Sequence, residues 1–243
     1  MYFPYIRGRQ YELLALKELL ITERLSEHIT PMLEPVKLSS TLSKTMEEFV
    51  ERNRNLCVIC NPAVGSFNSE MKDDEKDINK QKFIKLLSEM QIIKSHIIKK
   101  NSASNLSSWE KKSGQKKTDW YVINTNRDYL SIYLDLFEKD APKMSFIPDE
   151  SAFRRKVRRN RSLLEDRFNK RDRNSDYADN PDEFFSDDHL FYKDDGFEGF
   201  SDYSVIGADY LESGFAPYAV AIHIVYFDED MNLRVHHFVS DSN

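Results

Sequence analysis

Residues 196–214 read GFEGFSDYSVIGADYLESG, and we expect this stretch to close the fold. It holds four of the chain's seven glycines, and glycine is favoured where the backbone takes a positive φ or another group comes close. Apolar and polar side chains alternate after Gly199, which predicts a short strand over residues 200–206. Phe200 and Asp202 would share one face of that strand. Because burying an unpartnered carboxylate costs several kcal/mol, Asp202 would need a cation, a donor cluster or a ligand, or would cap backbone N–H groups.

Toward the N-terminus the sequence alternates strand-like and helix-like segments. Continuous apolar runs lie at residues 2–6, 29–36 and 56–60, and helical periodicity lies between them at 10–25 and 43–53. Strands that are apolar throughout are typical of parallel sheets covered on both faces. The chain is therefore predicted to begin as βαβαβ.

The middle of the chain continues this alternation less regularly. Helices are predicted over 83–90 and 129–137. Residues 101–118 are rich in Ser, Asn and Lys and predict a mobile connection, while 169–195 predict a long excursion. Because that excursion carries many aromatic residues, we expect it to pack on the body as a lid-like insertion. Further strands are predicted at 92–98, 120–123, 143–147, 162–165 and 200–206.

The C-terminal part changes character. Residues 218–226 alternate apolar and polar side chains, a polar turn follows, and 233–239 form another apolar run. This pattern predicts an antiparallel β-hairpin over 218–239. Eight strand-like runs, many separated by helices, predict that residues 1–243 form one α/β domain, a (β/α)8 TIM-barrel-like fold with irregular later units and an added hairpin. A mixed open α/β sheet is the alternative.

Composition bounds the class of protein. The net charge of −6 argues against nucleic-acid binding by the whole surface, although it allows a local basic groove. Cys57 and Cys60 would point to opposite faces of one strand, which suits neither a disulfide nor a zinc site. The start of the chain lacks a signal-peptide pattern, and no apolar run approaches the ~18 residues that span a bilayer. We therefore expect a cytoplasmic protein without membrane contact.

Ligand-binding residues are expected where the strands end, because parallel barrels carry their sites at the carboxyl ends of the strands. Arg and Asn side chains there suit a phosphate or sugar-like ligand, and carboxylates suit Mg²⁺ or Mn²⁺. Ordinary helix N-caps and loop starters are the alternative. The expected ligand-binding residues are Arg7, Glu34, Asn61, Asn124, Arg167 and Tyr203.

Four residues are candidates for catalysis, namely Asp202, Asp166, His223 and His237. His236 and His237 are adjacent and face opposite sides of their strand, so only one of them can join His223 on a shared face. A histidine from each hairpin strand together with Asp202 would resemble a metal or acid–base site. Hydrogen-bonded core histidines are the alternative.

Residues 154–173 are strongly basic and are followed by an acidic, aromatic stretch. Arg155, Arg158, Arg159 and Arg161 are therefore candidates for binding a polyanion such as nucleic acid. The alternative is that the two blocks of opposite charge neutralise each other across a loop. The common nucleotide, dinucleotide, α/β-hydrolase and zinc-protease motifs are absent from the sequence.

Five stretches of the chain carry a resemblance to known proteins, namely MYFPYIRGRQYEL, ITPMLEPV, LLEDRFNKRDRNSDY, GFEGFSDYSVIG and AIHIVYFDEDMNLRVHHFVSD. They resemble a family of uncharacterised bacterial proteins related to the beta family proteins, a group named after a phage product. The resemblance implies a barrel-like fold and a role in anti-phage defence, without implying a reaction. Members continue beyond the position of Asn243, so it also implies that a last helix is missing here. The shared positions are Arg7, Glu34, Asp166, Arg167, Asp202, Tyr203, His223 and His237.

The leading hypothesis is a barrel protein that binds a ligand or a protein partner, the latter encoded by a neighbouring defence gene. The competing hypothesis is an enzyme, a metal-dependent phosphodiesterase or nuclease in the same context. Its carboxylates Glu34, Asp166 and Asp202, with a histidine, would hold Mg²⁺ or Mn²⁺ and activate water. A scaffold subunit of a larger complex is a third interpretation, and the sequence leaves the oligomeric state open.

Overall fold

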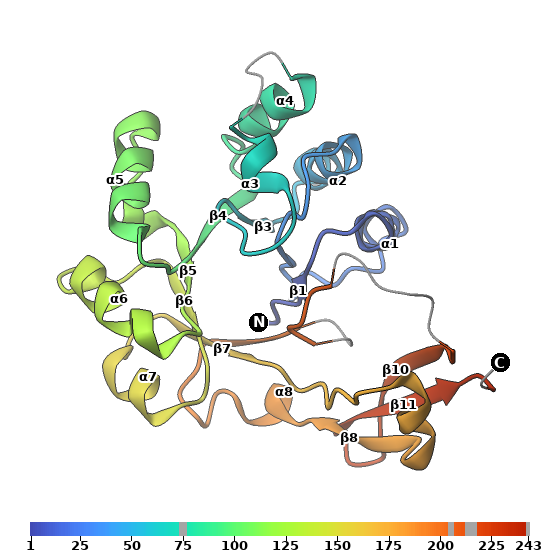
Figure 1. The fold of residues 1–243 in the computed structure, drawn as a ribbon. Coiled ribbons are helices and arrows are strands. Elements are labelled where there is room, and N and C mark those ends of the chain that lie inside the picture. The colour runs from blue at the N-terminus through green and yellow to red at the C-terminus, as the bar shows by residue number, and fades with distance from the viewer. Residues whose placement is uncertain (73–76, 204–206, 212–217, 242–243) are drawn as a thin grey trace.

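The computed structural model describes residues 1–72, 77–203, 207–211 and 218–241. Eight strands form one parallel sheet in the order β1-β2-β3-β4-β5-β6-β7-β9, with helices arranged around its outside (Figure 1). These strands are β1 (Tyr5–Ile6), β2 (Met32–Leu33), β3 (Leu56–Ile59), β4 (Ile92–Ile97), β5 (Tyr121–Ile123), β6 (Met144–Ile147), β7 (Arg161–Glu165) and β9 (Gly199–Asp202).

The N-terminal segment nearly closes this sheet into a barrel. Tyr2 forms an isolated parallel bridge with Phe200 of β9. Glycine is required beside it, because a Cβ at Gly199 would lie 2.7 Å from the Phe3 ring. The prediction of a (β/α)8 TIM-barrel-like α/β fold is confirmed, and the alternative of a mixed open sheet is wrong.

Helices around the parallel sheet pack buried apolar side chains against the strands. In α2, Met46 and Phe49 are fully buried, and Ser39 caps the start of the helix, where its hydroxyl accepts the Leu42 N–H at 3.2 Å. The helices are α1 (Gln10–Ile21), α2 (Ser40–Glu51), α3 (Phe67–Glu70), α4 (Ile78–Leu86), α5 (Ser102–Ser113), α6 (Leu130–Phe137), α7 (Ser151–Lys156) and α8 (Asp188–Phe191).

Successive residues of each strand belong to different parts of the core. Met32 and Cys57 pack in the cluster inside the barrel, whereas their neighbours Leu33 and Val58 pack in the cluster formed with the helices. Because both faces of the strands are buried, both sets of side chains are apolar. This arrangement accounts for the continuous apolar runs in the sequence.

A second, antiparallel sheet contains β10 (Ala221–Phe227), β11 (Leu233–Val239) and β8 (Asp182–Ser186), in the order β10-β11-β8. The predicted hairpin is confirmed. The prediction of residues 169–195 as a lid-like excursion is corrected, because Asp182–Ser186 pair along β11 as the third strand of this sheet. Figure 1 shows this small sheet outside the barrel, beside the ends of the parallel sheet.

The mobile connection predicted over residues 101–118 is wrong, because this segment contains helix α5. Leu106 is buried, and Trp109, three residues later, lies 5.6 Å from the ring of Trp120. The helix ends at Gly114, which has a φ of +70°. The spacing of the apolar residues and this glycine could have indicated the helix, but the polar composition of the segment obscured them.

The strand predicted over 200–206 is observed as Gly199–Asp202, so Asp202 is its last residue rather than a central one. Residues 204–206 lie outside the described part of the chain. The other predicted strands and helices lie near their expected positions, several with different bounds, and the short helices α7 and α8 were missed.

Candidate functional site

The barrel mouth brings two of the predicted ligand-binding residues into direct contact. Arg7 donates to Glu34 and to the backbone oxygen of Ala208. Glu34 is fully buried and also accepts the Tyr5 hydroxyl at 2.7 Å and the Ala63 N–H at 2.6 Å. The guanidinium and carboxylate expected to bind a ligand therefore bind each other and their surroundings.

The two asparagines at the strand ends differ from each other. Asn61 exchanges hydrogen bonds with the backbone N–H and carbonyl of Ile97, both at 2.8 Å. Asn124 is buried, and neither polar atom of its side chain has a hydrogen-bond partner. Asn61 thus joins two strands, and only Asn124 keeps hydrogen-bonding capacity.

The remaining predicted residues of the mouth also have protein partners. Asp166 accepts the Ala208 N–H at 2.8 Å, and the Tyr203 ring lies 5.5 Å from the Arg7 guanidinium. Arg167 makes a bidentate ion pair with Asp188, at 2.6 and 2.8 Å. The charged groups of the mouth are therefore largely committed to the fold.

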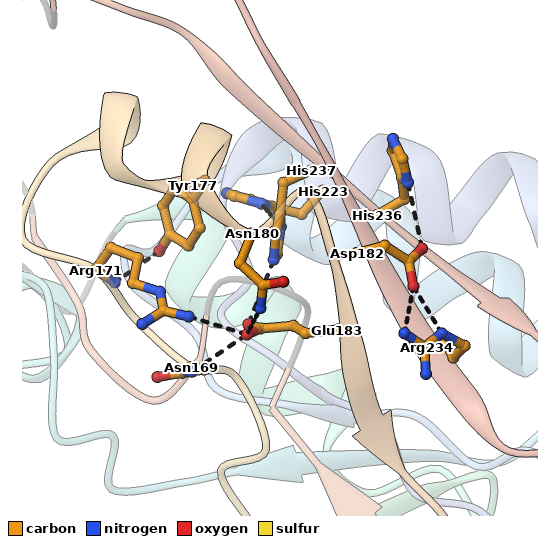
Figure 2. Close-up of polar contacts among 10 residues, drawn as sticks. All are labelled: Asn169, Arg171, Tyr177, Asn180, Asp182, Glu183, His223, Arg234, His236 and His237. Atoms are coloured by element: carbon orange, nitrogen blue, oxygen red, sulfur yellow. Dashed lines mark hydrogen bonds and ion pairs between the residues drawn. The ribbon is translucent and has the colours of Figure 1, made fainter.

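His223 and His237 form a direct pair on one face of the antiparallel sheet (Figure 2). Their Nδ1 atoms lie 2.7 Å apart, and the ring of Tyr177 packs against both, at 4.6 and 4.8 Å. Because of burial and the neighbouring His237, the pKa of His223 is lowered. The prediction that only one of His236 and His237 would join His223 is confirmed.

The third partner of this pair is Glu183, not Asp202. Glu183 lies 3.4 Å from His237 Nε2 and is held by Arg171, Asn169 and Asn180 (Figure 2). Along the sheet, the Val225–Val235 pair separates the histidines from the end of the sheet that faces Asp202. The expected site of two histidines and Asp202 is therefore not formed.

The carboxylates of the expected metal centre also lie apart. Glu34 contacts Arg7, Asp166 contacts the loop at Ala208, and Asp202 contacts Tyr2. Across residues 1–72, 77–203, 207–211 and 218–241, no three His, Cys, Asp or Glu side chains are grouped so that they could hold a metal ion.

The basic block divides into engaged and exposed arginines. Arg161 donates to the backbone oxygens of Gly196, Asp195 and Arg154, at 2.8 to 3.2 Å. Ion pairs from Arg167 and Arg171 reach the acidic block at Asp188 and Glu183. The other three candidates for polyanion binding, Arg155, Arg158 and Arg159, are exposed on the surface.

A cavity of about 270 Å³ lies between the outer face of β9 and the antiparallel sheet. Phe200 and Asp202 both line it, as their predicted shared face requires. Asp202 is only 7% exposed, and its Oδ1 accepts the Tyr2 hydroxyl at 2.6 Å. Burial is the main cause that raises the pKa of Asp202 to about 6.

The rest of the cavity wall is apolar and aromatic apart from His189. His189 Nε2 lies 2.8 Å from the Met231 carbonyl oxygen, whereas its Nδ1 is buried without a hydrogen-bond partner. Sequence reasoning missed His189, because it lies in the segment interpreted as an excursion. The other lining residues are Tyr2, Phe185, Tyr203, Val225, Phe227 and Leu233.

A larger cleft of about 950 Å³ lies near α4 and α5 and is lined partly by Lys72, Lys94 and Trp109. None of the sequence-predicted site residues lines it. Its wall also includes Met71 and Lys72, which directly precede residues outside the described ranges. The cavity beside Asp202 is therefore the better-defined candidate site.

Comparison with known proteins gives no match to a family model, a curated protein or a solved structure. Within the described ranges, no helix combines the length and apolar character needed to cross a membrane.

Proposed function

We propose that this chain is a ligand-binding protein built on a (β/α)8-like barrel, and that its ligand occupies the cavity beside Asp202. The observation that carries the proposal is a buried carboxylate on a largely apolar and aromatic wall, held by a single side-chain hydrogen bond from Tyr2. Pockets that combine apolar walls with a few polar groups of perturbed pKa are the usual form of a small-molecule site.

The biological setting of the proposal comes from the sequence resemblance alone. We place the protein in the bacterial cytoplasm as a component of an anti-phage defence module, with a protein partner from a neighbouring gene. No reaction is assigned. The phosphodiesterase or nuclease alternative gains no support from the positions of Glu34, Asp166 and Asp202, which contact separate partners.

A pair of variants on one strand tests the ligand site. Val225→Phe adds bulk inside the cavity, whereas Ile224→Phe adds it on the opposite, exposed face of β10. Ligand-observed NMR with a fragment library of neutral, anionic and cationic compounds should detect binders to the wild type and to Ile224→Phe. Val225→Phe should lose them. Equal binding to both folded variants would contradict the proposal, as would a library without binders.

A further inference from the structure

Asp202 and His189 on the cavity wall are both suited to accept hydrogen bonds. Because a carbonyl oxygen only accepts, the contact with Met231 places the proton of the neutral His189 ring on Nε2. The unpartnered Nδ1 is then an acceptor. The ionised carboxylate of Asp202 also only accepts, and each of its oxygens has two lone pairs. A ligand that meets both groups must donate hydrogen bonds.

The aromatic side chains supply a second preference. The rings of Tyr2 and Phe200 stack with centroids 4.7 Å apart. The His189 ring lies 5.4 Å from Phe227 and 6.4 Å from Phe200, which places it between two walls of the cavity. Aromatic faces attract cations through the ring quadrupole, and the attraction strengthens where water is excluded.

The charges around the cavity point the same way. The described residues that line it include neither Lys nor Arg. Arg167 lies close enough to affect Asp202, but it is bound through two nitrogens to Asp188. The charge of Asp188 contributes to raising the pKa of Asp202. An anionic ligand would therefore meet the carboxylate of Asp202 and no Lys or Arg among the described residues of the wall.

We propose that the cavity binds a small organic cation, a protonated amine on an apolar body. This inference rests on the proposed function and names the ligand class of the same site. The carboxylate of Asp202 would neutralise the charge, Nδ1 of His189 would accept an ammonium N–H, and the aromatic rings would cover the apolar body. A cavity of about 270 Å³ is near the lower end of the range for ligand sites, so the ligand is small.

Three probes of nearly equal shape test the charge preference. Benzylamine is cationic at about pH 8, benzyl alcohol is neutral and benzoate is anionic, and Asp202 is ionised there because its pKa is about 6. Ligand-observed NMR titrations on the intact protein should show that benzylamine binds at least about tenfold more tightly than benzyl alcohol. Benzoate should not bind.

Asp202→Asn provides the matched variant, because its amide oxygen can still accept the Tyr2 hydroxyl. It should lower benzylamine affinity to that of benzyl alcohol, whose own affinity should not change. Equal affinities of amine and alcohol in the wild type would overturn the cation assignment, as would an unchanged amine affinity in Asp202→Asn. Either result leaves the ligand site standing. Binding of all probes that survives Val225→Phe would instead contradict the site itself.

Discussion

Two buried carboxylates in this molecule have opposite surroundings. Glu34, at the barrel mouth, receives hydrogen bonds from Arg7, the Tyr5 hydroxyl and the Ala63 N–H. Asp202 lies beneath the antiparallel sheet and accepts one side-chain hydrogen bond, from the Tyr2 hydroxyl. Its pKa rises to about 6. The mouth uses its charges to hold the fold, whereas the cavity leaves an acceptor that a ligand can use. The two carboxylates should therefore respond differently to substitution.

The largest expected effect comes from Glu34→Ala. This change leaves the buried Arg7 guanidinium without its carboxylate, and such a loss costs about 3 to 5 kcal/mol of the free energy of unfolding. Urea denaturation measures it. Lys17→Ala removes an ion pair to Glu48 in the outer helices and should cost less than about 1 kcal/mol. Similar losses in the two variants would show that the buried Arg7–Glu34 pair contributes no more to stability than the partly exposed Lys17–Glu48 pair.

The second prediction has the opposite sign. The pKa of Asp202 rises from its ordinary 3.8 to about 6, or by about 2 units, and each unit is worth about 1.36 kcal/mol. The raised value means that the protonated carboxyl supports folding below about pH 4, and that this support is lost as the pH rises through about 6. Asp202→Asn should therefore stabilise the protein by up to about 3 kcal/mol near pH 8.

Denaturation of wild type and Asp202→Asn across this pH range measures the difference. The gain should shrink as the pH falls from about 6 toward about 4, since the wild-type carboxyl then becomes neutral as well. A variant that is less stable than the wild type near pH 8 would identify Asp202 as a structural residue. A gain would mark a site at which stability is lower than it could be, as is common where a residue serves binding.

The shared face of Phe200 and Asp202 could be predicted from sequence, because alternation along a strand fixes which side chains lie together. The surface opposite that face could not. Phe227 and Leu233 reach the cavity through pairing of the hairpin with β8, a short strand whose two initial acidic residues read as part of a charged loop. Periodicity is local, whereas this pairing spans about fifty residues, as in the contact between Asp182 and His236.

The barrel-mouth residues show a second limit of sequence reasoning. Their positions at the strand ends could be predicted from the apolar runs, which mark where each parallel strand stops. Their partners could not, because Arg7 meets Glu34 and Ala208 only in the closed barrel. A charged residue at a strand end gives the same sequence pattern whether it binds a ligand or another residue of the protein.

A smaller effect is expected at the histidine pair. The pKa of His223 lies below its ordinary 6.5 through burial and His237, and Glu183 lies on the far side of His237. The unfolded chain then binds protons more readily, so stability should fall as the pH drops below about 6.5. Because His223 is partly exposed to solvent, the loss should stay below about 1 kcal/mol. His223→Gln should flatten this part of the stability profile, measured by urea denaturation at several pH values. An unchanged profile would show that the histidine pair does not cause the loss of stability at low pH.

The smallest effect on stability, and a separate effect on binding, are expected in the basic block. Arg158 and Arg159 are exposed, whereas Arg161 donates hydrogen bonds to four backbone oxygens. Charge reversal of the exposed pair, Arg158→Glu with Arg159→Glu, should leave the free energy of unfolding within about 0.5 kcal/mol. If this block binds polyanions, the same variant should weaken binding to a single-stranded oligonucleotide and reduce its dependence on salt between about 50 and about 200 mM.

Fluorescence anisotropy at several salt concentrations separates the possible results. Arg24→Glu with Lys139→Glu, which reverses two exposed charges elsewhere, is the matched control for net charge. A loss confined to the Arg158 and Arg159 variant would locate a polyanion site in the basic block. Equal losses in both variants would indicate attraction by net charge alone, and unchanged binding would remove the block from consideration. If the losses are equal or binding is unchanged, the positive charge of the basic block is explained by its ion pairs to Asp188 and Glu183, which join segments of opposite charge.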